Sequence, residues 1–424
     1  MNSKVQIERS GLPGILILLI IISIINCSID ATETKMEKVT SVATWASPYW
    51  GYHTPKIVRN NLGELWTISM AGKYPGADMQ IHKRTIAGQW VAGKIFSGYY
   101  QPGMLLLDSE GRLNIILNSQ EKPEEHWRSL DSENLNQFAL IAKGNGVPDG
   151  RGWYVGTAID NDVLYQTYVT LDYTSYLSTK GLTDTVWSPA QEIHDGYAHK
   201  LGNHSLLYSG FEFSKSNVFI CGSYSRDGSV HNTYEEIILK YYPIGQPDKL
   251  LSETIFKGDS GYYSFGYDMV VDSRNEEIYV AHSAGIHSYG PTIDDPVEAG
   301  LYVSVGKAGT GDWTLNKIMD GSGSLALYLD ESKNALYAFI TSGGWFDRNI
   351  LQVKESLDKG KTWKDVSETI LTPDMPTLEH PYFIQVISPK SGSVFDKPIL
   401  VFSNMSDKKN ADSLYVFDLY CLEL

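Results

Sequence analysis

The stretch Ser356-Leu357-Asp358-Lys359-Gly360-Lys361-Thr362-Trp363 has the composition of a tight turn between two β-strands. Asp358 can accept hydrogen bonds from backbone N–H groups of the turn, and Gly360 can adopt the positive φ that such turns require. Thr362 and Trp363 favour extended backbone, and a large indole can pack between neighbouring sheets. The octapeptide therefore predicts a β-hairpin that packs against a second sheet.

A second pattern recurs along most of the chain. It consists of an apolar strand, a turn of Asp, Asn, Ser or Gly residues, and another apolar strand. Its copies span residues 57–66, 106–113, 158–164, 211–219, 270–278, 328–336 and, more weakly, 387–400. The spacing of the copies is that of a four-stranded propeller blade with variable loops. Unrelated hairpins in a β-sandwich are the alternative, and seven regular copies favour the propeller.

We predict an all-β, seven-bladed β-propeller of four-stranded blades, with six blades as the second choice. After the last copy, the chain has room for one further strand, at residues 413–420. The missing strand of that blade can come from Lys38 to Trp45, which precedes the first copy. Pairing the two ends would close the ring and leave no open sheet edge.

Composition limits the classes of partner. The 424-residue chain carries a net charge of −15, which argues against a nucleic-acid or anionic-membrane surface. Aromatic residues make up 12% of the chain and its 38 glycines suit many turns. We expect a single domain over residues 37–424, monomeric and without a nucleic-acid partner.

The N-terminus has the features of an export signal. Lys4 and Arg9 precede an apolar run over residues 15–25, too short for a comfortable membrane span. The sequence Ile24-Ile25-Asn26-Cys27 resembles a bacterial lipobox, although Asn26 departs from its usual small residue. We therefore predict a signal peptide at 1–27, lipidated at Cys27 or simply cleaved, and a polar tether at 28–36. The protein is expected to be exported, and either anchored at the cell surface or outer membrane or secreted.

Signals for metals and disulfides are weak. Beyond Cys27 only Cys221 and Cys421 remain, and two cysteines make no disulfide framework. Asp294-Asp295 could hold Ca²⁺, but adjacent acids in a loop are usually just solvated. We predict no cofactor and no metal site.

Histidine, tyrosine and arginine residues gather where propeller loops line the central pocket. Aromatic faces stack on sugars, and Arg binds carboxylate or sulfate through two parallel hydrogen bonds. Each histidine alone would normally be a surface or core residue, and only their common placement favours a site. The candidates for substrate binding are His53, Gln101, His231, His282, Trp345, Arg348 and His380.

The octapeptide matches the Asp-box of the bacterial neuraminidase repeat, and the layout over residues 45–405 resembles propellers of the ulvan-type polysaccharide lyases. Gly111-Arg112-Leu113, His126-Trp127-Arg128-Ser129 and the segment Gly222 to Asp227 carry this resemblance. It implies that a His or Tyr abstracts the proton beside a uronate carboxylate, while a cation neutralises the acid.

Carried over by position, the resemblance implies specific catalytic roles. Arg226 would neutralise the carboxylate, His199 or His204 would be the base, and Tyr267 would donate a proton. One departure is Gln101, which stands where the family tends to have His, so the mechanism would be lost or shifted to His53. A sialidase is not supported, because only Arg226 and Arg348 are placed for its three converging arginines.

The sequence thus predicts an exported propeller that acts on polysaccharide at its central pocket, with a lyase for uronate-containing glycan as the enzyme hypothesis. The alternative is a non-catalytic propeller that binds glycan or protein. Propellers host both kinds of function, so the fold alone does not separate them. Gln101 and the acidic charge favour binding, whereas the His, Tyr and Arg set favours catalysis.

Overall fold

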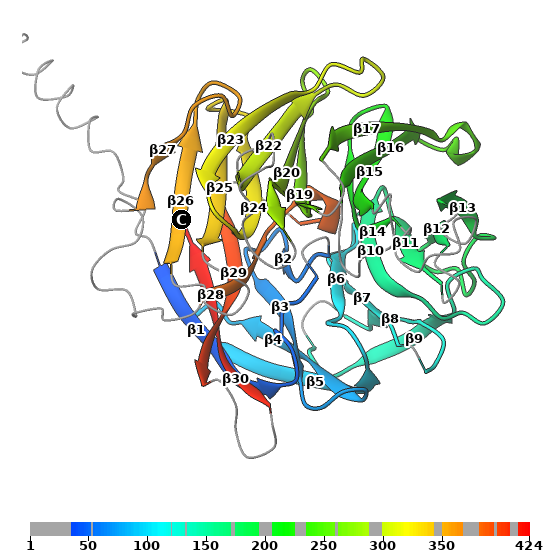
Figure 1. Cartoon of the computed structure of the whole chain (residues 1–424). Coiled ribbons are helices and arrows are strands. Elements are labelled where there is room, and N and C mark those ends of the chain that lie inside the picture. The colour runs from blue at the N-terminus through cyan, green and yellow to red at the C-terminus, as the bar shows by residue number, and fades with distance from the viewer. Residues whose placement is uncertain are drawn as a thin grey trace, which may run out of the picture.

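The computed structural model contains seven four-stranded antiparallel sheets arranged as the blades of a ring (Figure 1). It describes residues 35–51, 54–119, 121–131, 134–170, 174–194, 206–224, 235–258, 262–287, 299–342, 350–367, 381–393, 397–407 and 414–424. Across these ranges, no helix is long and apolar enough to cross a membrane. The seven-bladed all-β propeller is confirmed, and the six-bladed alternative is wrong.

Each blade is a four-stranded meander, and from blade one to blade seven the first strands of successive blades contact one another. Blades one to four use consecutive strands in sheet order. These are β2 (Ile57–Arg59), β3 (Leu65–Ala71), β4 (Ala77–Arg84) and β5 (Trp90–Tyr99); β6 (Met104–Leu107), β7 (Leu113–Leu117), β8 (Glu125–Ser129) and β9 (Phe138–Lys143); β10 (Trp153–Asp160), β11 (Val163–Val169), β12 (Ser175–Gly181) and β13 (Gln191–His194); β14 (Leu207–Phe213), β15 (Asn217–Tyr224), β16 (Glu236–Pro243) and β17 (Leu251–Lys257).

Blades five to seven complete the ring. The structure also contains a small two-stranded ribbon and two 3₁₀ turns outside the blade sheets. The blade strands are β19 (Gly266–Asp272), β20 (Glu277–Ala284), β22 (Gly300–Gly306) and β23 (Thr314–Asp320); β24 (Gly323–Asp330), β25 (Ala335–Ser342), β26 (Ile350–Ser356) and β27 (Lys364–Asp365); β28 (Pro381–Val386), β29 (Ile399–Asp407), β30 (Tyr415–Glu423) and β1 (Lys35–Thr44). The ribbon pairs β18 (Tyr262–Tyr263) with β21 (Ile286–His287), and the 3₁₀ turns are η2 (Pro247–Lys249) and η3 (Pro389–Ser391).

All seven copies of the repeated pattern fall on the hairpin between the first and second strands of a blade. The turn residues act as their type predicts. Oδ1 of Asn60 accepts hydrogen bonds of 3.0 Å from the N–H groups of Leu62 and Glu64, and Asp108 plays the same part in blade two. Side-chain acceptors thus close the turns from which the blades were recognised.

The chain ends close the ring as predicted. In blade seven, β1 pairs antiparallel with β30, from Lys35 opposite Glu423 to Thr44 opposite Tyr415. In Figure 1 these two strands, blue and red, lie side by side. The strand begins at Lys35, so it includes the last two residues assigned to the tether. The predicted signal peptide and Cys27 lie outside the described residues.

The octapeptide forms the turn between β26 and β27 of blade six. The carboxylate of Asp358 accepts hydrogen bonds of 2.7 to 2.8 Å from the N–H and hydroxyl of Thr362 and from the hydroxyl of Ser356. These bonds, led by the one from the Thr362 backbone, lower the pKa of Asp358 to about 2. Nζ of Lys359 lies 2.8 Å from Glu277 of β20, which ties the turn to blade five.

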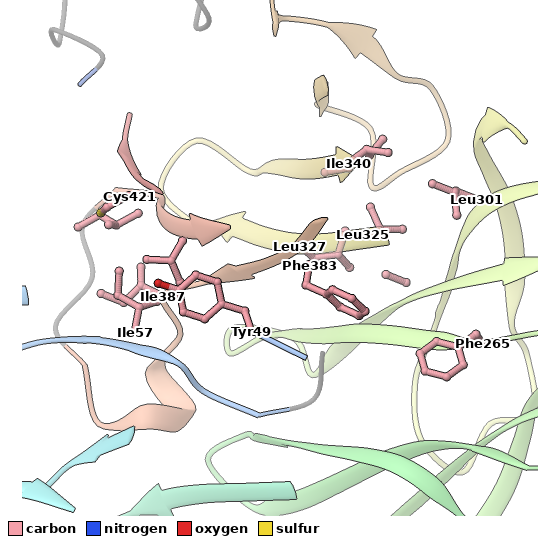
Figure 2. Close-up of a cluster of buried hydrophobic side chains, with 14 of the residues drawn as sticks. Tyr49, Ile57, Phe265, Leu301, Leu325, Leu327, Ile340, Phe383, Ile387 and Cys421 are labelled. Carbon is pink, nitrogen blue, oxygen red and sulfur yellow. The ribbon is translucent and has the colours of Figure 1, made fainter. Parts of the chain in front are cut away.

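Apolar side chains fill the space between adjacent blades. Figure 2 shows a buried cluster with Ile57 of blade one, Leu301 of blade five, Leu325 of blade six and Cys421 of blade seven. Full burial of such a side chain contributes about 1.5–3 kcal/mol to folding. The blades are therefore held together mainly by the hydrophobic effect.

The connection between β28 and β29 crosses the ring where the other first strands end. We call residues 389–393 the back loop. Its 3₁₀ turn η3 contacts β6, β10 and β14, and Oγ of Ser393 accepts a 3.2 Å hydrogen bond from the N–H of Arg59 in β2. A Cβ on Gly392 would lie only 1.9 Å from the carbonyl oxygen of Leu107, so the loop is tightly packed. The back loop therefore closes one end of the central channel.

Candidate functional site

The first strands of all blades begin at the opposite end of the channel, which we call the site face. Connections that lead into a first strand, or that follow a second strand, lie at this face because the strands alternate in direction. The back loop and the octapeptide turn lie at the other face. The sequence analysis placed its candidate residues at the site face.

Most of the candidates lie outside the described residues. They are His53, His199, His204, Arg226, His231, Trp345, Arg348 and His380, and Asp294-Asp295 is outside as well. The backbone of Tyr267 is described, in β19, where the pairing with β20 shifts register between Gly266 and Asp268. The convergence of these side chains stays a prediction.

Gln101 is described and lies directly before β6. Its Oε1 accepts a 2.8 Å hydrogen bond from Nδ2 of Asn118 and a 2.9 Å hydrogen bond from the N–H of Tyr154. The residue is only 8% exposed. Its carbonyl oxygen therefore joins blade two to the first strand of blade three and positions Tyr154.

His282 lies within β20 and is fully buried. Its Nε2 is 2.8 Å from Oγ of Ser304 on β22, and its Nδ1 is 3.0 Å from the carbonyl oxygen of Ser283. Burial lowers the pKa of His282 to about 4, so the ring is neutral at physiological pH. With both ring nitrogens bonded inside blade five, this side chain has no exposed surface to offer a substrate.

Aromatic side chains form a continuous series of ring contacts across the site face. Centroids of successive rings lie 4.6 to 6.3 Å apart, mostly in edge-to-face geometry. We call this series the aromatic ladder, and in spatial order it comprises Tyr74, Trp45, Tyr100, Trp50, Tyr154, Tyr208 and Phe265.

The inner end of the ladder depends on irregular backbone. Tyr154 and Tyr208 have φ of 49° and 54°, each at a register shift near the start of a first strand, β10 and β14. Phe383 of β28 has φ of 43° at an equivalent shift in blade seven. Positive φ is costly for such large side chains and is found preferentially at binding or catalytic sites. The bulges turn these rings away from the regular alternation of the strands.

Tyr100 of the ladder is neutral at physiological pH. Burial raises the pKa of Tyr100 to about 12, and the nearby hydroxyls of Tyr154 and Tyr74 add to the shift. Its hydroxyl can therefore both donate and accept a hydrogen bond. The ladder combines apolar ring faces with tyrosine hydroxyls, which matches the amphipathic surface of a sugar ring.

Below Tyr208, the channel ends in a charged cluster. Nζ of Lys390 in the back loop lies 3.3 Å from Glu212 of β14 and 3.1 Å from Asp268 of β19. Burial raises the pKa of Glu212 to about 7, although Lys390 opposes the shift. Burial alone would lower the pKa of Lys390, but Asp268 and Glu212 more than offset this and raise it. Asp268 and Lys390 line a small cavity of about 20 Å³, enough for a single water molecule.

Buried polar side chains join neighbouring blades near the site face. Nζ of Lys56, which precedes β2, donates to Oγ1 of Thr54 and to the carbonyl oxygen of Pro102. Burial lowers the pKa of Lys56 well below its usual value. Nε2 of Gln385 donates a 2.9 Å hydrogen bond to the carbonyl oxygen of Gly51 and links blade seven to blade one. These hydrogen bonds join blades one, two and seven close to the ladder.

Among the residues that the structure describes, no group of three or more His, Cys, Asp or Glu side chains is placed to hold a metal ion. Cys221 and Cys421 are both buried free thiols. Burial raises the pKa of Cys221 to about 12, so this thiol is not a reactive thiolate.

No family model matches the sequence, and no curated protein sequence matches it. Solved structures do resemble it. A PL25 ulvan lyase, solved bound to -[GlcA(1-4)Rha3S]-, has a TM-score of 0.62 and 12% sequence identity over 91% of this chain and 95% of that chain. Polysaccharide lyase Uly1 has a TM-score of 0.52 and 11% sequence identity, over 90% of this chain and 92% of that chain. At such identities the similarity establishes the fold.

Most residues of the ladder, including Trp45, Trp50, Tyr154 and Tyr208, were not among the predicted site residues. One signal was available, because an aromatic residue stands two positions before a glycine in both Tyr154-Val155-Gly156 and Tyr208-Ser209-Gly210. A Cβ on Gly156 would lie 1.9 Å from the carbonyl oxygen of Ser209, so the bulged strands approach closely. A glycine two positions after an aromatic residue, at the start of a first strand, therefore marks the bulge.

Proposed function

We propose that the protein binds polysaccharide at the site face and cleaves uronate-containing glycan there by β-elimination. The aromatic ladder carries this proposal, because it leads from the outer part of the site face to the channel with apolar ring faces and tyrosine hydroxyls. The structural similarity to a lyase solved with a glucuronate-containing oligosaccharide supports the choice of substrate class. Export, with or without a lipid on Cys27, would bring the protein to such polymers.

The reaction needs a base, a cation and a proton donor. His199 or His204 would remove the proton at C5 of the uronate, and Arg226 would neutralise the carboxylate on which the negative charge develops. The electron pair of the broken C–H bond forms the C4–C5 double bond, and the glycosidic oxygen leaves C4. Tyr267 would protonate that oxygen. The products are an unsaturated uronate and a shortened chain with a free hydroxyl.

Ultraviolet absorbance tests the chemistry directly, because the unsaturated uronate absorbs and the substrate does not. The purified chain is incubated with ulvan, polygalacturonate and alginate, and binding to each is measured in parallel. We expect the absorbance to rise with at least one polymer. Arg226→Ala should abolish this rise, and Arg112→Ala, at a turn on the opposite face, should leave it intact. An equal rise in Arg226→Ala would contradict the assigned role.

A non-catalytic glycan-binding propeller is the second candidate, and the geometry of Gln101 favours it. The side chain that occupies this position cannot titrate, and its carbonyl oxygen is used to hold Tyr154 and Asn118. Binding of a polymer without any rise in absorbance would support this candidate over the lyase.

A further inference from the structure

We propose that Trp45, Tyr74 and Tyr100 form a second sugar-binding surface, outside the channel, that holds a flanking part of a long glycan chain. We call these three residues the outer platform. The inference rests on the proposed function, since it assumes that the site face binds glycan. It adds that the protein prefers polymers to short oligosaccharides, and it names the residues that create this preference.

The three rings form one compact unit. Trp45 and Tyr100 are stacked, with centroids 5.8 Å apart and planes 27° from parallel. Tyr74 meets both edge-on, at 5.3 Å from Trp45 and 5.4 Å from Tyr100. Each ring comes from a different connection at the site face: β1 to β2, β3 to β4, and β5 to β6. Three loops therefore converge to build this surface.

The platform is fixed in place without a ligand. The N–H of Trp45 donates a 3.1 Å hydrogen bond to the carbonyl oxygen of Gly72, and the N–H of Gly72 donates one of 2.7 Å to that of Ala43. The N–H of Tyr100 donates to the carbonyl oxygen of Asn118. A preformed aromatic surface binds without a large cost in ordering.

Exposure separates the platform from ordinary core packing. Tyr74 is 54% exposed, and Trp45 and Tyr100 are partly exposed, whereas Trp66 in the core of blade one is 1% exposed. Exposed aromatic side chains that contact one another form a contiguous apolar patch, and such patches mark binding sites. The apolar face of a pyranose ring covers such a surface and leaves its hydroxyls to the tyrosine O–H groups.

The platform is continuous with the channel. The ring centroid of Trp50 lies 6.0 Å from that of Trp45 and 6.2 Å from that of Tyr100. It also lies 6.3 Å from the ring centroid of Tyr154, at the bulge of β10. A glycan with one sugar in the channel can therefore follow the ladder outward to Tyr74. A short oligosaccharide in the channel does not reach the platform, which is why chain length should matter.

The test compares the affinity of the full protein for ulvan with its affinity for a short ulvan oligosaccharide of one repeating unit. Tyr74→Ala is expected to weaken polymer binding about three- to tenfold, the range of one aromatic contact, and to leave oligosaccharide binding unchanged. Tyr74→Phe keeps the ring and should retain most of the polymer affinity. Leu357→Ala, an exposed apolar side chain at the opposite face, is the matched control.

The outcomes separate this inference from the proposed function. Unchanged polymer affinity in Tyr74→Ala, with normal binding by the wild type, overturns the platform and leaves the proposed function standing. An equal loss for polymer and oligosaccharide also overturns it, because Tyr74 would then belong to the channel site. A change in self-association alone would identify a contact between copies and overturn it too. If the wild type binds no glycan, both proposals fall.

Discussion

Lys390→Met removes the cation that Glu212 and Asp268 share at the closed end of the channel. Both carboxylates are largely buried, at 7% and 14% side-chain exposure, and Lys390 itself is 8% exposed. Breaking a buried ion pair in this way costs about 3–5 kcal/mol, because a buried charge is left without compensation. We expect the free energy of unfolding to fall by that amount at pH 8, since the back loop also loses its polar attachment to blades four and five.

The loss should depend on pH, with a sign that follows from Glu212. Its folded pKa of about 7 lies above the unfolded value of about 4.3, so the native state holds more protons between these limits. The contribution of Glu212 to the stability of the wild type therefore falls as pH rises towards 7 and then levels off. Without Lys390 the folded pKa of Glu212 rises further, so stability of the variant continues to fall above pH 7. The difference between the two proteins widens towards pH 9.

Urea unfolding followed by tryptophan fluorescence at pH 5.5 and 8.5 measures both effects. Lys333→Met is the matched control, because Lys333 pairs with Asp330 at 3.1 Å but is 70% exposed, and such a pair contributes less than about 1 kcal/mol. The double variant Glu212→Gln with Lys390→Met should recover part of the loss at pH 8.5. A loss for Lys390→Met no larger than the control, or one that is the same at both pH values, refutes this account of the cluster.

Two further carboxyl groups give predictions of opposite sign. Asp358→Ala should lower the melting temperature at pH 7, and wild type and variant should converge as pH falls from about 4 to 2, because the contribution of an acid with a lowered pKa is lost through that range. Leu357→Ala in the same turn should change little, and an undiminished gap at pH 2 would contradict the role of the Asp358 carboxylate. Burial raises the pKa of Glu124 to about 8, so its ionisation destabilises the fold as pH rises from about 4 to 8. Glu124→Gln should therefore raise the melting temperature relative to wild type more at pH 8.5 than at pH 5, and an equal difference at both pH values would argue against a raised pKa.

The fold could be predicted because its signals are local. Each first hairpin is marked by a turn acceptor such as Asn60 or Asp108 between two apolar strands, and the same two-strand unit recurs in every blade. Ring closure followed from a count of strands, since blade seven needed one that only the N-terminus could supply. The start of β1 at Lys35 could not be read from the sequence, because it depends on the partner strand β30.

The site was less predictable because its contacts are not local. Trp50 and Tyr154 lie far apart in the chain and meet only because a connection from blade seven crosses the site face towards blade one. Period-two alternation also fails at the bulges that turn Tyr154 and Tyr208. His282 shows the converse: it stands near the end of a second strand, as a pocket residue would, but β20 is buried on both faces between β19 and β22.

The closed end of the channel constrains how a polymer can use it. The back loop contacts β6, β10 and β14 and bonds to Arg59, Glu212 and Asp268, so a chain has no passage through the ring. Under the proposed function, a glycan must therefore enter and leave by the site face and lie across it. The ladder provides a path in one direction, from Tyr208 out to Tyr74. A sugar held at the channel would then be joined, on the side of the ladder, to a longer chain that lies along these rings.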